Sequence, residues 1–340
     1  MSDLNEARLT QWLEQVLDGP VQMAKVEKFP GGQSNPTYRL DLADRSLVLR
    51  RKPSGPLLPS AHAVDREFRL LSALKPFGFP VPRPVALCED EGVIGSIFYV
   101  MEMVKGRTFW DGRLTELNQP ERRGYYLALV DTLAALHKVD HIAVGLGDFG
   151  AAGNYVARQV QRWTKQYRAA QTDDLPVIEK LIAWLPKTLP EQTRTSIIHG
   201  DYRIDNLIFS LDGPQPLAVL DWELATIGDP LADFAYFAMN WVIPPDGRSG
   251  LGGIDLEKAG IPGLDEIVSR YCQATGRDGV PDLHWYFSYN LFRLVGIIQG
   301  IKKRLADGNA SNAKAAEIVA LIEPYAHVAW EQAKLAGARD

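Results

Sequence analysis

The chain has 340 residues, of which 46% are hydrophobic and 23% charged, and its formal net charge is −5. This length is too great for one compact core, so two lobes are expected. The negative charge argues against nucleic acid or an anionic membrane as the main partner. No apolar run reaches the roughly 18 residues that a membrane span requires.

The two cysteines and the N-terminal residues indicate the cellular compartment in which the protein is expected. Cys88 and Cys272 are the only cysteines, and they form neither a disulfide framework nor a metal-spaced cluster, which favours a reducing environment. Residues 1–6 lack the cationic and apolar regions of a signal peptide. We therefore expect a cytoplasmic protein, and the sequence leaves its oligomeric state open.

Hydrophobic patterning predicts that the first portion of the chain is β-rich. Apolar residues recur at helical spacing from Leu9 to Leu17, and Gly19-Pro20 should end that helix. Alternating residues and one apolar run predict strands over 26–29, 38–42, 47–50 and 97–104, with a helix over 63–74.

Helices dominate the remainder. They are predicted over 125–137, 154–167, 175–185 and most of 264–340, with short strands over 196–199 and 217–220. Asp229 and Pro230 should open another helix as its N-cap and first residue. The sequence thus predicts an α+β protein with a small β-rich lobe over 1–104 and a larger helical lobe over 105–340, joined near residues 104–107.

The stretch from His199 to Asn206 is the most informative part of the sequence. Asp201 and Asn206 stand five apart, the spacing of the base and a metal ligand in protein-kinase catalytic loops. The apolar segment 217–220 then delivers Asp221, with Glu223 two residues later. We predict that Asp201 orients the attacking hydroxyl or accepts its proton. Asn206 and Asp221 would bind Mg²⁺, and Glu223 would bind a second metal ion directly or through water.

These motifs, HGDxxxxN followed by D-x-D/E, resemble those of the aminoglycoside phosphotransferase family of small-molecule kinases, with choline and fructosamine kinases as wider relatives. The resemblance covers about residues 29–237. Segments 31–38 and 49–67 look most like the kinase-like module fused to some acyl-CoA dehydrogenases. The resemblance implies a two-lobe protein-kinase-like fold that holds ATP and Mg²⁺ in the cleft. The matching residues are His199, Gly200, Asp201, Asn206, Asp221 and Glu223.

The turn Gly31-Gly32-Gln33-Ser34-Asn35 lies between two predicted strands. Its backbone N–H groups could approach phosphates closely because glycine has no Cβ. The alternative is an ordinary hairpin loop. The sequence contains neither a GxGxxG nor a Walker A pattern, so a Rossmann site and a P-loop are not supported.

Arg50 ends a predicted strand in register with the phosphate-binding lysine of kinases. Period-2 alternation places Val48 on the same face, so Val48 could cover adenine while Arg50 reaches the phosphates. Glu67 matches the helix glutamate that pairs with this cation. Arginine replaces the usual lysine, and its guanidinium is bulkier but can grip phosphate in bidentate fashion. The alternative is a solvated charge run, Arg50 to Lys52, in which case Lys52 is the fallback ligand.

The segment Met101-Glu102-Met103-Val104 is predicted to be the hinge strand. The backbone at Glu102 and Val104 would present an acceptor and a donor to an adenine edge. A plain buried strand is equally consistent with these residues.

Other polar residues near the motifs have structural explanations. His199 should hold the loop through side-chain hydrogen bonds, and His137 should be a satisfied core or capping histidine. Asp205 should be a loop hydrogen-bond partner or exposed. Asp229 and Asp233 should serve as an N-cap and a first-turn acid.

The sequence therefore predicts a kinase that moves the γ-phosphoryl group of ATP to a hydroxyl of a small molecule. A nucleotide-binding pseudokinase or adaptor module, a metal-dependent phosphohydrolase and a true aminoglycoside kinase remain alternatives. Residues 241–340 hold twelve acidic and eleven basic residues, so they offer no acidic excess for a polycation. Six aromatics, at least half expected in the core, suit a partly apolar acceptor, and the resemblance suggests a hydroxyacyl-type metabolite. They are Trp241, Trp285, Tyr286, Phe287, Tyr289 and Phe292.

Overall fold

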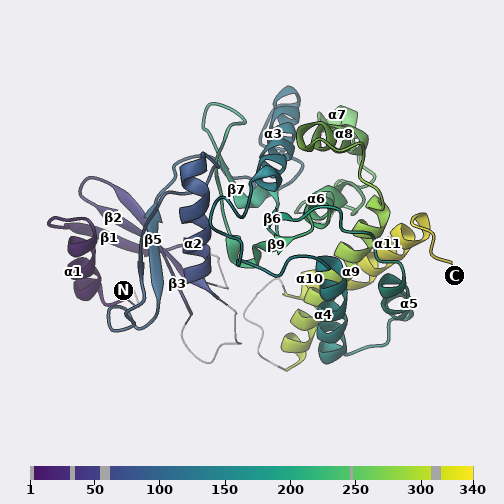
Figure 1. Cartoon of the computed structure of the whole chain (residues 1–340), viewed down its shortest axis with the longest axis horizontal. Helices are drawn as coiled ribbons and strands as arrows, with labels where there is room; N and C mark the ends of the chain where they lie inside the picture. The colour runs from purple at the N-terminus through teal and green to yellow at the C-terminus, as the bar shows by residue number, and fades with distance from the viewer. Residues whose placement is uncertain (1–3, 31–34, 54–61, 246–247, 308–314, 340) are drawn as a thin grey trace. The chain divides into compact units, whose positions relative to one another are not determined.

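The computed structural model describes residues 4–30, 35–53, 62–245, 248–307 and 315–339. The chain divides into two compact units (Figure 1). The first comprises Met1–Thr108, Val144–Leu146 and Asn206–Ala225, and the second comprises Phe109–Ala143, Gly147–Asp205 and Thr226–Asp340. The first unit thus differs from the predicted lobe 1–104 chiefly by recruiting residues 206–225 from later in the sequence.

The first unit is built on a five-stranded antiparallel sheet with strand order β1-β2-β3-β5-β4. Four of these strands correspond to predicted ones. The fourth along the chain, β4, was missed because its residues, Pro-Val-Ala-Leu-Cys, do not alternate. The strands are β1 (Met23–Lys28), β2 (Thr37–Leu42), β3 (Ser46–Arg51), β4 (Pro84–Cys88) and β5 (Phe98–Glu102).

The two faces of this sheet have different surroundings. Helix α1 (Glu6–Val16) covers one face, where its Leu9 and Leu13 pack into an apolar cluster with Leu47 and Leu49 of β3. Because side chains alternate along a strand, Val48 and Arg50 point to the opposite face. The register β3–β5 sets Val48 opposite Met101 and Arg50 opposite Tyr99.

Helix α2 (Val64–Leu74) packs against β4 and β5, and the short 3₁₀ helix Lys75–Phe77 follows it. The rings of Phe68 in α2 and Tyr99 in β5 have centroids 6.0 Å apart. This contact carries Glu67, the neighbouring residue in α2, to the face of the sheet that bears Arg50.

A hairpin completes the first unit. Strands β7 (Leu207–Phe209) and β8 (Pro216–Val219) pair antiparallel, between the 3₁₀ turns Ile204–Asn206 and Trp222–Leu224. The Arg107 and Phe209 backbones exchange hydrogen bonds of 2.8 Å. A Cβ at Gly106 would lie 2.3 Å from the Phe209 carbonyl oxygen, so this approach requires glycine.

The second unit is mainly helical, with one short antiparallel pair of strands. Helix α9 contacts α4, α6, α10 and α11, while α3 packs on α8. The strands are β6 (Ser196–Ile198) and β9 (Thr226–Gly228). The 3₁₀ helices are Leu185–Lys187 and Met239–Trp241. The α-helices are α3 (Gln119–Lys138), α4 (Tyr155–Ala170), α5 (Pro176–Trp184), α6 (Pro230–Ala238), α7 (Leu256–Ala259), α8 (Leu264–Thr275), α9 (Leu283–Ala306), α10 (Ala315–Val319) and α11 (Ile322–Leu335).

The β-rich first unit and the helical second unit confirm the predicted α+β, two-lobe class. Cys88 and Cys272 are both free and buried. Among the helices of the described ranges, none is long and apolar enough to cross a membrane. The six aromatics proposed for an acceptor pocket are all buried, with at most 7% of each residue exposed. The prediction that at least half of them belong to the core is confirmed, and none of the six is among the residues that line the cavity of the first unit described below.

Candidate active site

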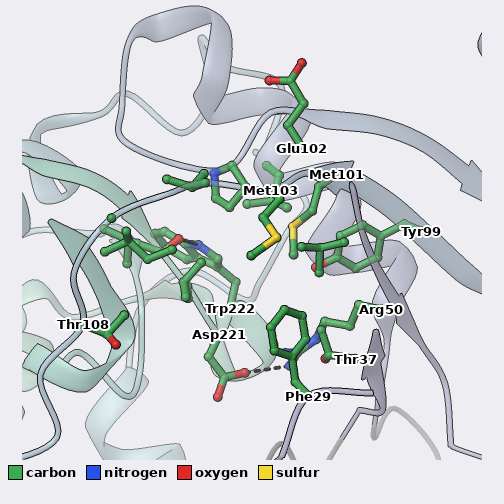
Figure 2. A pocket seen from close by; sticks show the side chains of 18 residues that line it. Phe29, Thr37, Arg50, Tyr99, Met101, Glu102, Met103, Thr108, Asp221 and Trp222 are labelled. Atoms are coloured by element: carbon green, nitrogen blue, oxygen red, sulfur yellow. Dashed lines mark hydrogen bonds and ion pairs between the residues drawn. The ribbon is translucent and has the colours of Figure 1, made fainter. Parts of the chain in front are cut away.

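The first unit contains a cavity of about 400 Å³ between the sheet and the β7–β8 hairpin (Figure 2). Its lining is mostly apolar, and its charged side chains include Arg50 and Asp221, which Figure 2 shows joined. The volume and the mixture of apolar walls with a few polar groups are typical of small-molecule sites. The apolar wall includes Val48, Leu71, Met101, Met103, Ile208 and Leu220.

The predicted hinge residues line this cavity. Glu102 and Val104 are among its lining residues, but in Figure 2 the Glu102 carboxylate points away from Met101 and Met103. That carboxylate lies 3.3 Å from Arg83 Nε. The backbone N–H of Glu102 donates to the Arg83 carbonyl at 2.9 Å. Any role of Glu102 toward a ligand in the cavity would thus be carried by its backbone.

Arg50 lies at the centre of a charged network. Its Nε is 2.9 Å from Glu67 Oε2, and its Nη2 donates to Asp221 Oδ1 at 2.7 Å. Glu223 Oε2 lies 3.8 Å from the same Nη2. Only 13% of the Arg50 side chain is exposed, so the alternative of a solvated charge run is wrong. Lys52 is not among the residues that line the cavity.

Glu67 is buried and satisfied by three neighbours. In addition to Arg50, the Tyr99 hydroxyl donates to its Oε2 at 3.1 Å, and Asn35 Nδ2 donates to its Oε1 at 2.9 Å. His62 Nδ1 lies 3.1 Å from Asn35 Oδ1, which can only accept, so Nδ1 carries the proton. The structure therefore places the Asn35 side chain on Glu67. The other predicted turn residues, Gly32, Gln33 and Ser34, lie outside the described part of the chain.

This network carries more negative than positive charge. Burial raises the pKa of the Glu67 carboxyl above its ordinary value, Arg50 opposes that rise, and Asp221 and Glu223 add to it. Burial alone would lower the pKa of Arg50, but the surrounding acidic groups keep it above its ordinary value. One guanidinium thus serves three carboxylates, and a divalent cation would offset the excess negative charge.

The predicted metal ligands in this unit come from the two ends of the hairpin. Asp221 follows β8 in a left-handed conformation, with φ of 63°. The Leu220 N–H donates to the Asn206 carbonyl at 2.8 Å, which sets Asn206 across the hairpin from the residue before Asp221. Among the described residues no three His, Cys, Asp or Glu side chains form a metal cluster. Carboxylate and amide oxygens nevertheless suit Mg²⁺, which needs few protein ligands when phosphates supply the others.

Asp201 lies in the second unit, on the loop after β6. Its Oδ1 accepts a hydrogen bond from the Tyr236 hydroxyl at 2.7 Å and lies 3.2 Å from Arg203 Nε. The Asp201 N–H donates to His199 Nδ1 at 3.2 Å. His199 therefore holds the loop as predicted. Asp205 is also a loop partner, because its Oδ2 accepts from Arg248 Nη2 at 2.6 Å.

Asp233 has a larger role than the predicted first-turn acid of α6. Its Oδ2 accepts from the His199 N–H and its Oδ1 from the Gly200 N–H, both at 2.8 Å. His137 Nε2 lies 3.2 Å from Oδ2. Gly200 has a φ of +82°, a left-handed conformation that glycine adopts without strain. One buried carboxylate from α6 thus fixes the backbone immediately before Asp201.

The surroundings of Asp233 keep its carboxyl ionised. Burial by itself would raise its pKa, but hydrogen bonds and charge from His137 and the His199 backbone outweigh burial, so the pKa lies below its ordinary value. A carboxylate only accepts, so His137 Nε2 carries the proton, and Nδ1 lies 2.8 Å from the Tyr271 hydroxyl. His137 is the satisfied core histidine that the sequence predicts.

Several residues that shape the site were not assigned to it from the sequence, although Asp233 belongs to a family pattern that follows the metal motif. Tyr99 could have been proposed from its period-2 relation to Met101, but Asp233, Tyr236 and Arg293 act across long sequence separations. Arg293 Nη2 donates to the Gly200 carbonyl at 2.6 Å from a helix about 90 residues later in the chain. No local pattern signals such contacts.

Comparison with known proteins shows the family to which this chain belongs. Residues 25–277 match the model of a phosphotransferase enzyme family, the APH family, which covers most of the chain. The chain therefore belongs to this family, as the motif resemblance predicted.

The similar curated proteins include acyl-CoA dehydrogenase family members. The chain is 46% identical to acyl-CoA dehydrogenase family member 10 of Mus musculus over 323 residues, which is 94% of this chain and 30% of that protein. It is 40% identical to family member 11 of Homo sapiens, covering 91% of this chain and 40% of that protein. The chain thus spans well under half the length of these relatives.

Solved structures confirm the predicted kinase-like fold. A protein of Ralstonia eutropha JMP134, described provisionally as an aminoglycoside phosphotransferase, has a TM-score of 0.89 at 42% identity, covering 98% of this chain and 99% of that one. Aminoglycoside phosphotransferase APH(4)-Ia, solved with ADP and hygromycin B, has a TM-score of 0.61 at 14% identity, with 98% and 99% coverage. The second likeness shows the fold alone.

The Asp233 contacts generate a stability prediction. Asp233→Asn should lower the free energy of unfolding at pH 7 by about 1–3 kcal/mol, because one buried N–H loses its acceptor. A carboxyl whose folded pKa is depressed stabilises above its unfolded pKa, roughly 3.9, and loses that contribution as pH falls through the folded pKa. The difference from wild type should therefore shrink below about pH 4, as measured by urea unfolding.

The matched control is Asp265→Asn, an exposed first-turn acid of α8. It should change stability by less than about 0.5 kcal/mol. Equal losses of unfolding free energy in the two variants would mean that Asp233 acts only as an ordinary first-turn acid.

Proposed function

We propose that this chain uses ATP and Mg²⁺ to transfer the γ-phosphoryl group to a hydroxyl of a small molecule. The observation that supports this most directly is the Arg50 network with Glu67 and Asp221 at the apolar cavity of the first unit. An apolar wall suits a purine ring, and the adjoining charges suit phosphates and their metal ion.

The nucleotide would be held by elements of the first unit. Val48 and the hinge methionines would cover adenine, while the backbone at Glu102 and Val104 would meet its polar edge. Arg50 would contact phosphates, and Glu67 would orient it, as the ion pair of 2.9 Å does already. The assignment of Gly32, Gln33, Ser34 and Asn35 to the phosphates remains a prediction.

Asn206 and Asp221 are the proposed magnesium ligands, with Glu223 as a second-metal or water-mediated ligand. When bound, Mg²⁺ would neutralise phosphate charge and fix the orientation of the transferring group. Asp221 is bound by Arg50 in the structure, so this carboxylate would redistribute its contacts between the guanidinium and the metal.

Asp201 would orient the acceptor hydroxyl and take its proton. Its carboxylate is held by Tyr236 and Arg203, and its backbone by His199. Such a placement suits general-base catalysis in a reaction that depends mainly on positioning and charge neutralisation. A pseudokinase would not require this arrangement.

For the acceptor we propose a hydroxyacyl-type metabolite. The support is the 46% and 40% identity to proteins named as acyl-CoA dehydrogenase family members. The near-neutral charge of residues 241–340 also disfavours a polycation. The six aromatics of residues 241–340 are buried and do not indicate an acceptor. An aminoglycoside is the second candidate, favoured by the description of the 42%-identical Ralstonia protein.

The role of Arg50 is tested by comparing two ligands. Arg50→Ala should weaken ATP by about tenfold or more, since a hydrogen bond to a charged group contributes roughly 1.5–3 kcal/mol. Adenosine should be nearly unaffected because it lacks the phosphates. Titration calorimetry measures both affinities, with Lys52→Ala as the control and Arg50→Lys as a variant that keeps a cation beside Glu67. Equal weakening of ATP and adenosine would make Arg50 structural.

The metal ligands are tested by comparing affinities with and without Mg²⁺. Asp221→Ala should abolish most of the Mg²⁺-dependent gain in ATP affinity, because Asp221 lies two residues after the end of β8 and lines the cavity. Glu223→Ala should retain more of that gain, since Glu223 is not a lining residue. ATP affinity measured in EDTA shows how much each variant changes binding without metal, including the effect of removing the ion pair between Asp221 and Arg50. A larger loss for Glu223→Ala would reverse the proposed ligand order.

The reaction itself is tested by acceptor-dependent ADP release across hydroxyacyl compounds and aminoglycosides. Asp201→Asn should lower kcat by roughly 10²–10⁴-fold while MgATP affinity is unchanged, the range for a positioned acid or base. The control is Asp212→Asn on the exposed tip of the β7–β8 hairpin. A folded Asp201→Asn protein with near wild-type turnover would remove Asp201 from the mechanism. Turnover with aminoglycosides but not with hydroxyacyl compounds would overturn the proposed acceptor.

A further inference from the structure

Tyr236, on helix α6, lies directly against the carboxylate proposed as the base. Its hydroxyl donates to Asp201 Oδ1 at 2.7 Å, and 4% of the residue is exposed. Burial and the nearby Asp201 raise the pKa of the Tyr236 hydroxyl, so it stays protonated and acts as a donor. A hydrogen bond from a neutral hydroxyl to a carboxylate is among the stronger ones in proteins.

Arg293, on helix α9, contacts both the Tyr236 ring and the catalytic loop. Its guanidinium carbon lies 4.9 Å from the centroid of the Tyr236 ring and 5.5 Å from that of Trp163. Its Nη2 donates to the carbonyl of Gly200, the residue before Asp201. The side chain is buried, and within the described part of the chain no acceptor bonds its Nε, so the two rings add cation–π contacts to the one hydrogen bond from Nη2.

These contacts act on the orientation of the Asp201 carboxylate, which the backbone contacts of the catalytic loop do not fix. Asp233 and His199 hold the backbone around Asp201. The terminal torsion of an aspartate side chain is broad, so backbone contacts alone do not orient its carboxylate. A donor on a carboxylate oxygen does so: Tyr236 supplies one from helix α6, and Arg203, on the loop itself, lies 3.2 Å from the same Oδ1.

We propose that Tyr236 is the positioning residue for Asp201 in phosphoryl transfer, and that Arg293 holds the Tyr236 ring and the Gly200 carbonyl in the arrangement this requires. The inference deepens the proposed function and rests on Asp201 being its base. Neither residue belongs to the HGDxxxxN or D-x-D/E motifs.

The test is Tyr236→Phe, which keeps the ring and removes only the donor. It should lower kcat by about 10–100-fold, as loss of a group that orients a catalytic residue does, with KM for MgATP unchanged. In an Asp201→Asn background the same change should cost less than about twofold, because its effect passes through the carboxylate. Arg293→Lys, which keeps the charge but loses the planar stack, should show a smaller fall in kcat.

The matched control is Tyr286→Phe, which removes another buried hydroxyl that donates to a carboxylate, that of Asp229 at 2.6 Å. It should lower stability without a selective effect on kcat. If the Tyr236→Phe loss multiplies fully with the Asp201→Asn loss, Tyr236 has only a structural role and the proposal is overturned.

A crystallographic comparison decides the inference independently of turnover. The Asp201 carboxylate should rotate or occupy two orientations in Tyr236→Phe, and it should keep its orientation in Tyr286→Phe. An unchanged Asp201 carboxylate in Tyr236→Phe overturns the positioning role. If the wild-type protein itself releases no ADP with any acceptor, the proposed function fails, and the orientation of Asp201 still decides whether Tyr236 positions it.

Discussion

The ion pairing of the buried Arg50 guanidinium with Glu67 and Asp221 is the interaction on which the first unit depends most. It ties strand β3 to helix α2 through Glu67 and to the end of β8 through Asp221. Removing one partner of such a buried pair commonly costs about 3–5 kcal/mol, because the remaining charge is left unpaired. The same network forms the charged part of the cavity lining, so folding and the proposed phosphate chemistry rely on one set of contacts.

In the second unit a buried carboxylate has the corresponding structural role. The loop before Asp201 contains buried backbone N–H groups, which would be costly to leave without acceptors. Asp233 accepts from two of them, and His137 in turn satisfies Asp233. Tyr236 and Arg293 then act on the carboxylate and on the Gly200 carbonyl. The backbone and the side chain of the proposed catalytic segment are thus held by separate groups.

Arginine at position 50 gives this site a character different from that of a lysine. A lysine ammonium is a compact point charge, whereas a guanidinium presents donors in a planar fork and can bind two acceptors at once. Here Nε faces Glu67 and Nη2 faces Asp221. The proposed cation for phosphate and the proposed ligand for the metal are therefore already in contact, so binding of a nucleotide with its metal ion would have to compete with that contact.

Alternation, helical periodicity and motif spacing are local signals, and they predict the class of fold and most of its elements. The motif spacing also predicts Asp201, Asn206 and Asp221 as site residues. It also predicted that Val48 and Arg50 share a face, which follows from the pleat of a strand. The sequence does not predict β4 because its residues lack alternation, nor β7 and β9 because they have only three residues each. The packing of the helices places all six aromatics in the core, sets Asp233 against the loop, and brings Tyr236 to Asp201 and Arg293 to Gly200. Those contacts join residues from about 30 to 90 positions apart, and their formation depends on how helices α6 and α9 pack, which no local pattern encodes.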